Sequence, residues 1–151
     1  MKLSRKGEYA CRAMLELSLR YGSGPQRTEL IAKEQEIPVR YLEQILLSLR
    51  RAGFVRSQRG PEGGYQLARS PSQITIAEVT RAMDGPIAPL GCVSALEHDQ
   101  CSRQEICGLW LLWNKVRDSV CRIMETTTFA EVAEETRRLL AEAGARRTET
   151  G

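Results

Sequence analysis

The segment that most constrains this chain is a helix-like stretch followed directly by a glycine-rich hairpin. Between residues 39 and 51, apolar residues recur with i, i+3, i+4 and i+7 spacing, at Leu42, Ile45, Leu46 and Leu49. This spacing predicts a helix with one buried face, and Gly53 is suited to end that helix in a left-handed cap. The next segment, FVRSQRGPEGGYQLAR (54–69), predicts two short strands around a Gly-Pro-Glu-Gly-Gly turn.

Two shorter helices are expected before this segment. Apolar residues favour one helical face over residues 8–21, the glycine-rich segment 22–25 then breaks the chain, and Thr28 is a suitable N-cap for the second helix. A short helix, a tight turn and a helix with a polar outer face form a helix-turn-helix, and a basic hairpin after it forms a wing that contacts phosphates or the minor groove. The expected fold is therefore mostly α with a small β-hairpin wing: a winged helix-turn-helix DNA-binding domain with a bracing helix over residues 1–84.

The charge distribution favours a polyanionic partner for this domain. Residues 1–70 carry 13 Lys and Arg against 7 Asp and Glu, whereas residues 71–151 carry 9 against 12. The alternative is an ordinary solvated surface, but the helix-turn-helix pattern favours double-stranded DNA. The predicted DNA-contacting residues lie on the polar face of the third helix and in the adjacent turns, and they are Thr28, Arg40, Tyr41, Glu43, Gln44, Arg51, Arg59 and Gly60.

Three capping boxes mark the expected starts of later helices. They are formed by Thr75 with Glu78, Ser102 with Glu105, and Thr128 with Glu131. The second box predicts a helix from Ser102 to about residue 125, with one continuous apolar stripe and Trp110 and Trp113 as anchors. Such a stripe either packs within the monomer or pairs with a second copy of the chain. We expect residues 102–144 to form a long dimerisation helix and a C-terminal helix, with a frayed tail over residues 145–151. A homodimer would read a palindromic operator.

Three of the five cysteines are concentrated in the expected loop over residues 85–107. Cys92, Cys101 and Cys107 are separated by eight and five residues, and the only histidine, His98, lies between the first two. Four chemistries are compatible with this pattern: an iron–sulfur cluster, a zinc site with His98 as fourth ligand, a redox disulfide switch, and simple burial. In the second turn of a helix, Cys107 would have its thiol pKa lowered by the helix dipole, which favours ligation or oxidation. Cys11 and Cys121 lie in apolar helical patterns, which favours core packing.

The sequence favours the cytoplasm. No apolar run approaches the roughly 18–20 residues of a membrane span, and the start MKLSRKGEYA lacks the apolar stretch of a secretory signal. Disulfides are uncommon in the cytosol, where clustered cysteines more often bind metal or sense redox change. An enzyme is not expected, because the chain has one histidine, no paired nucleophile and base, and no phosphate-binding loop.

These parts together resemble a known family. The opening MKLSRKGEYACRAM, the segment IPVRYLEQILLSLRRAGFVRSQRGPEGGYQLAR and the three cysteines before a long helix resemble the IscR/NsrR-type bacterial transcription regulators, over residues 1 to about 140. The resemblance implies a homodimer whose DNA affinity changes with the state of a [2Fe-2S] or [4Fe-4S] cluster, in response to redox state, nitric oxide or iron and cluster status. It also implies roles for particular residues: cluster ligands at Cys92, Cys101 and Cys107, recognition-helix contacts at Arg40, Tyr41 and Glu43, and a wing contact at Arg59.

The chain departs from the family pattern at the fourth ligand. The cluster-biogenesis regulators carry a histidine three residues after the third cysteine, where this chain has Trp110, and their first cysteine gap is shorter. In the nitric-oxide-sensing branch, an acidic residue at the start of the first helix of the partner subunit completes the cluster, and Glu8 stands at that position here. Glu8 is therefore the expected fourth ligand, with His98 as runner-up. A cluster-free regulator with a thiol or zinc switch is the alternative.

Overall fold

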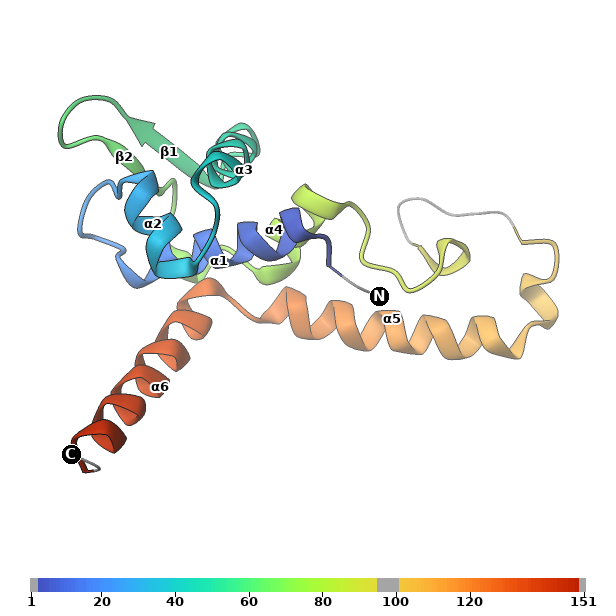
Figure 1. Cartoon of the computed structure of the whole chain (residues 1–151). Helices are drawn as coiled ribbons and strands as arrows, with labels where there is room; N and C mark the ends of the chain where they lie inside the picture. The colour runs from blue at the N-terminus through green and yellow to red at the C-terminus, as the bar shows by residue number, and fades with distance from the viewer. Residues whose placement is uncertain (1–2, 95–100, 150–151) are drawn as a thin grey trace.

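The structure, a computed structural model, describes residues 3–94 and 101–149. The described residues form six α-helices, one antiparallel hairpin and three short 3-10 turns (Figure 1). In chain order these are α1 (Arg5–Leu19), α2 (Thr28–Gln35), α3 (Val39–Arg51), β1 (Val55–Gln58), β2 (Gly64–Leu67), a 3-10 turn (Pro71–Gln73), α4 (Ile76–Asp84), 3-10 turns (Gly91–Val93 and Gln104–Ile106), α5 (Gly108–Thr126) and α6 (Phe129–Glu149). Figure 1 shows α1–α4 and the hairpin gathered into one body, with α5 extending past its edge and α6 projecting away from it.

The core of this body is formed by the buried faces of α1, α3 and α4. The four apolar residues predicted to face inward from α3 are at most 1% exposed, which confirms the predicted stripe. Phe129, the first residue of α6, is also 1% exposed and belongs to the same core. Its backbone N–H donates to the carbonyl of Ile74 at 2.9 Å. The long arm formed by α5 therefore returns to the body, and α6 begins inside the core.

Several predicted helix ends are confirmed. Gly53 follows α3 with φ of 80°, a conformation in which a side chain would be strained. Thr75 and Glu78 form a complete capping box at the start of α4. At the start of α6, Thr128 N–H donates to Glu131 Oε2 at 2.7 Å, and Glu131 N–H donates to Thr128 Oγ1 at 3.3 Å. These local signals are accurate because each depends only on residues within one helical turn.

Two helix starts differ from the prediction. Helix α1 begins at Arg5 because the side chain of Ser4 accepts a hydrogen bond from Gly7 N–H at 3.0 Å. Helix α2 begins at Thr28 itself, so the N-cap is Arg27, which provides no side-chain cap. The residue before it, Gln26, is held by an antiparallel bridge to Tyr65, and this bridge keeps the chain extended up to Arg27.

The long helix also begins later than predicted. Residues Gln104–Ile106 form a 3-10 turn, in which Ile106 and Cys107 donate to carbonyls three residues back. Cys107 is extended and serves as the N-cap of α5, so its predicted place in the second helical turn is wrong. At the other end of the chain, the predicted fraying from residue 145 is also wrong, since α6 continues to Glu149. None of the helices in the described residues is long and apolar enough to cross a membrane.

A carboxylate joins the end of α4 to the start of α1. Asp84, the last residue of α4, accepts hydrogen bonds from the backbone N–H of Ser4 at 2.8 Å and from the Ser4 hydroxyl. Gly7 packs against this carboxylate, because a Cβ at residue 7 would lie 2.4 Å from Asp84 Oδ2. The absence of a side chain at residue 7 therefore allows α4 to hold the first turn of α1.

We expect Gly7→Ala to lower the free energy of unfolding by about 1–3 kcal/mol, because the new methyl group overlaps the Asp84 carboxylate. In an Asp84→Ala background the same change should raise the free energy of unfolding by up to ~1 kcal/mol, because alanine is the better helix former. Urea unfolding of the four proteins of this double-mutant cycle measures both values. An equal effect of Gly7→Ala in the two backgrounds would show that the overlap does not govern stability.

Candidate functional site

The polar face of α3 is one half of the candidate site. Arg40, Glu43, Gln44 and Arg51 are exposed on it, opposite the buried stripe. Tyr41 is different: its half-buried ring packs edge-on against Tyr9 of α1, with ring centroids 5.6 Å apart. Its aromatic ring therefore fixes α3 against α1 at the border of this polar face.

The hairpin is the other half. β1 pairs with β2 in antiparallel register, and the turn between the strands carries the exposed residues Arg59 and Gly60. Arg50 near the end of α3 donates to Ser57 Oγ of β1 at 3.1 Å, which ties the helix to the wing. Thr28 is half-buried in the first turn of α2. The predicted DNA-contacting residues therefore come from three adjoining elements, α2, α3 and the wing.

The wing is held by two residues that the sequence did not single out. Gln26 exchanges two backbone hydrogen bonds with Tyr65 of β2, at 2.7 and 2.8 Å, and forms an isolated antiparallel bridge beside the hairpin. A Cβ at Gly64 would lie 2.2 Å from the Gln26 carbonyl oxygen, so this close approach requires a glycine. The guanidinium of Arg27 donates to the Pro61 carbonyl at 2.6 Å. Together these contacts fix the direction of the wing relative to α2 and α3.

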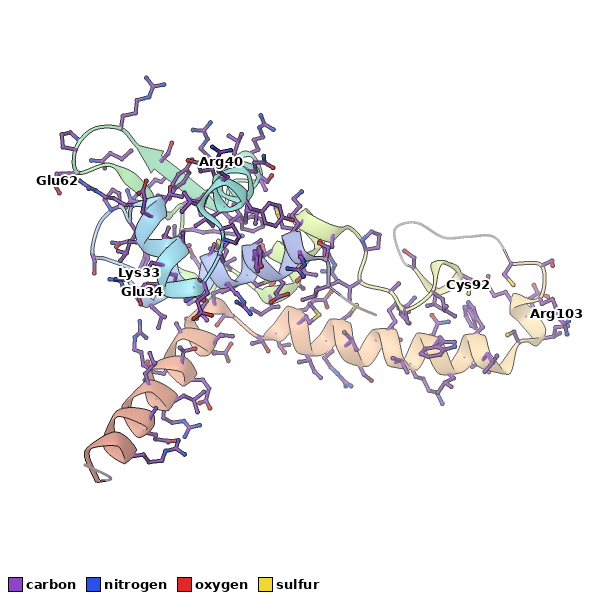
Figure 2. The ribbon with its side chains drawn as sticks, in the orientation of Figure 1. Lys33, Glu34, Arg40, Glu62, Cys92 and Arg103 are labelled. Atoms are coloured by element: carbon purple, nitrogen blue, oxygen red, sulfur yellow. The ribbon has the colours of Figure 1, made fainter. Side chains whose placement is uncertain are left out.

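We expect Arg27→Ala to weaken DNA binding by about ten-fold, a change of ~1.4 kcal/mol in binding free energy. The reason is that the wing turn loses the contact that orients Arg59. Lys33→Ala is the matched control: it removes one positive charge from α2, and Lys33 lies at the end of that helix away from the wing (Figure 2). Fluorescence anisotropy with a duplex operator measures both affinities. Equal losses in the two variants would indicate a general charge effect and contradict a role in wing orientation.

The cysteine segment lies at the far end of α5 from the body. Figure 2 shows Cys92 and Arg103 there, remote from Arg40 and Glu62 of the predicted DNA-binding domain. Cys92 belongs to the 3-10 turn Gly91–Val93, and Cys107 caps α5. The indole N–H of Trp110 donates to the Cys92 carbonyl at 3.1 Å, so the Cys92 turn is fixed to the same end of α5 as Cys107.

The three cysteine thiols are of the type that binds an iron–sulfur cluster, although the fold of one chain does not bring them together. Cys92, Cys101 and Cys107 are free thiols, Cys101 is exposed, and Cys107 is the N-cap of α5. In the part of the chain that the structure describes, no three Cys, His, Asp or Glu side chains form a group that could hold a metal ion. His98, the runner-up fourth ligand, lies outside the described residues.

Cys11 and Glu8 differ from these three thiols: the first is a half-buried packing residue and the second is an exposed carboxylate. Burial raises the pKa of the Cys11 thiol, which a hydrogen bond from Thr80 only partly offsets, so Cys11 is a protonated packing residue. Glu8, the expected fourth ligand, is on the first turn of α1, with its side chain 48% exposed and paired with Arg12 at 2.9 Å. A surface pair of this kind contributes about 0–1 kcal/mol. The Glu8 carboxylate is therefore accessible to a second chain.

Comparisons with known proteins agree on the class of protein. The model of the Rrf2 family, described as an iron-dependent transcriptional regulator, matches residues 3–135. The transcriptional regulator CymR of Bacillus subtilis is 38% identical over 133 residues, which are 88% of this chain and 90% of CymR. The solved structure of CymR, the global cysteine regulator of that organism, has a TM-score of 0.74 at 36% identity and covers 89% of this chain and 98% of its own. The structure of T. potens IscR has a TM-score of 0.70 at 32% identity, with 90% and 88% covered.

Proposed function

Because this chain belongs to the Rrf2 family of DNA-binding transcription regulators, we propose that it is a homodimer whose operator binding is controlled by an iron–sulfur cluster. Its mostly helical winged fold is that of its solved relatives, which are transcription regulators and not enzymes. The observation that carries the proposal is the set of three free thiols at one end of α5, in a family described as iron-dependent. We place the protein in the cytoplasm, with a palindromic DNA duplex as its partner.

In this proposal, Cys92, Cys101 and Cys107 hold the cluster and Glu8 of the partner subunit completes it. The cluster, when bound, supplies iron centres that respond to oxidation, nitric oxide or iron supply. Cys107 binds from the N-cap position of α5. Cys92 binds from a turn that Trp110 already fixes to α5.

Contacts within the chain also connect the cysteine segment to the DNA-binding domain. The segment that carries Cys92 continues directly from α4, whose last residue, Asp84, holds the start of α1 and thus the first turn that bears Glu8. Ligation of one cluster by Cys92, Cys101 and Cys107 of one chain and by Glu8 of the partner subunit would therefore fix one DNA-binding domain relative to the other. A ligand shifts such an equilibrium only through a preference for one arrangement. Ligation by Glu8 provides that preference, because it is possible only when the two chains are correctly placed.

Anaerobic purification tests this proposal. The protein is expected to be brown, to show visible charge-transfer bands, and to contain iron and inorganic sulfide in equal amounts. Operator fragments selected from a random duplex library should bind differently before and after cluster removal, with a steep salt dependence in both states. A colourless protein without iron would refute cluster control and favour the alternative, a thiol switch, for which the exposed thiol of Cys101 is the supporting observation.

The fourth ligand has its own test. Glu8→Ala is expected to change the visible spectrum and to shorten the lifetime of the cluster in air, because one ligand is lost. Arg12→Ala is the matched control, since it removes the ion-pair partner of Glu8 and leaves the carboxylate in place. A spectrum that changes with Arg12→Ala and not with Glu8→Ala would exclude Glu8 as a ligand, and His98→Ala would then be the variant to examine.

A further inference from the structure

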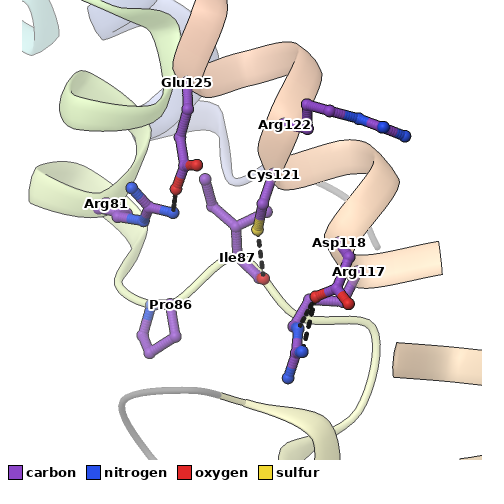
Figure 3. A pocket seen from close by; sticks show the side chains of 8 residues that line it. All are labelled: Arg81, Pro86, Ile87, Arg117, Asp118, Cys121, Arg122 and Glu125. Carbon is purple, nitrogen blue, oxygen red and sulfur yellow. Dashed lines mark hydrogen bonds and ion pairs between the residues drawn. The ribbon is translucent and has the colours of Figure 1, made fainter. Parts of the chain in front are cut away.

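A cavity lies where α5 crosses the end of α4, and it includes neither the three cysteines of the proposed cluster site nor the predicted DNA-contacting residues. Figure 3 shows this α4–α5 pocket from close by. Its volume of about 500 Å³ lies within the range of small-molecule sites, roughly 300–1,000 Å³. Its apolar part is formed by Pro86, Ile87 and Cys121. The guanidinium groups of Arg81 from α4 and of Arg117 and Arg122 from α5 line it as well.

The apolar part is rigidly built. Ile87 follows α4, and its carbonyl accepts a hydrogen bond from the Cys121 thiol of α5 at 3.6 Å (Figure 3). Arg117 donates to the carbonyl of Val93 and thereby fixes the other end of the same connecting segment to α5. The segment from Ile87 to Val93, whose first residues form one wall of the open pocket, is therefore attached to α5 at both ends.

The pocket lies on a different side of α5 from the residues that we propose at the centre of the dimer interface. An α-helix turns by about 100° per residue, so Leu112 and Ile123, on the exposed apolar stripe of α5, point about 160–180° away from Cys121. A two-helix interface built on that stripe would cover the opposite side of α5. An interface centred on Leu112 and Ile123 therefore leaves Cys121 uncovered, although Leu109 of the same stripe points only about 120° away from Cys121.

The charges of the pocket favour an anion. The pocket is lined by three guanidiniums and two carboxylates. Arg81 pairs with Glu125 and Arg117 pairs with Asp118 at 2.6 Å, so these five side chains together carry one excess positive charge. Each guanidinium has five N–H donors. Arg81 uses one N–H for Glu125 and also interacts with the Cys121 thiol, which leaves other donors of this guanidinium for a ligand. Arg122 has no ion-pair partner among residues 3–94 and 101–149. Figure 3 shows its exposed side chain extended away from the pocket, so it must turn inward to reach a ligand.

We propose that the α4–α5 pocket binds a small organic carboxylate. The acid group contacts Arg81 and Arg122, and the apolar body of the ligand contacts Pro86, Ile87 and the Cys121 side chain. Such a ligand bridges α4 of the DNA-binding body and α5 of the arm, so its binding stabilises one relative position of the two helices. This site is independent of the cluster, and its ligand would be a second input to the regulator.

The test is a titration of the full-length protein with hexanoate and benzoate, followed by NMR of the backbone amides. We expect saturable binding, with the largest shifts at Ile87 and Cys121. The neutral analogues hexanamide and benzamide should bind about ten-fold more weakly or worse, since they lack the charge that the guanidiniums recognise. Inorganic phosphate should also bind more weakly, because it has no apolar body.

Two variants of α5 complete the test. Arg122→Gln should weaken hexanoate binding by about ten-fold, whereas Lys115→Gln, which removes the same charge from the same helix outside the pocket, should leave it unchanged. Both residues are exposed, so neither change is expected to affect folding. Three results would each overturn the proposal: no saturable binding of either acid, equal binding of acid and amide, or equal losses in the two variants.

Discussion

Replacing Cys92 with alanine is expected to abolish the cluster, with loss of the visible charge-transfer bands and of bound iron and sulfide. The reason lies in the ligand set: clusters of this kind are usually held by four ligands, and the described chain offers three thiols at the end of α5. Loss of one thiol leaves too few donors even if Glu8 of the partner subunit contributes. Operator affinity should then equal that of wild-type protein from which the cluster has been removed. Anaerobic spectra, metal analysis and anisotropy measure the three quantities.

Cys121→Ala is the matched control for this experiment. Cys121 is a half-buried thiol on the same helix, but its thiol bonds the Ile87 carbonyl, three helical turns or more away from Cys107. This variant should keep its colour and its bound iron and sulfide, because Cys121 is not among the proposed ligands. A Cys92→Ala protein that retains the wild-type spectrum would refute the proposed ligand set.

Local patterns were sufficient to predict the DNA-binding domain. The α3 stripe from Leu42 to Leu49, the left-handed Gly53 and the capping box at Thr75 each depend on residues within one or two helical turns, and the structure confirms all three. The helix that was predicted from Ser102 shows where such patterns fail. Its capping-box sequence was present, but residues 104–106 form a 3-10 turn and Cys107 is extended, so the helix begins at Gly108.

Contacts between distant segments could not be predicted in the same way. Arg27 reaches Pro61 of the wing across 34 positions, and Asp84 reaches Ser4 across 80. Neither residue belongs to a motif, and each acquires its role only when the fold brings two elements together. In the sequence, Gly64 and Gly7 were the residues that could have indicated these close contacts. Each lies next to one of them, where a side chain would overlap a neighbouring element.

The other large effect is expected on α5, where Leu112→Glu should convert the proposed dimer into monomers. In the single chain no residue of α5 is buried, and Leu109, Leu112 and Ile123 are 64%, 50% and 64% exposed along one stripe. Burial of one leucine contributes roughly 1.5–3 kcal/mol, and a two-fold interface loses that contribution twice. It must also desolvate two carboxylates, which adds a further cost. The dimer should therefore weaken by at least about 10²–10⁴-fold, which corresponds to ~3–6 kcal/mol.

Sedimentation equilibrium measures this change, and operator binding reports its consequence, because a monomer contacts only one half-site of a palindrome. Leu111→Glu is the matched control. Leu111 is 59% exposed and directly precedes Leu112, but it points about 100° away from it and lies outside the stripe. We expect this variant to remain dimeric and to bind the operator as the wild type does. If Leu111→Glu dissociated the protein while Leu112→Glu did not, the subunits would have to associate through another face of α5.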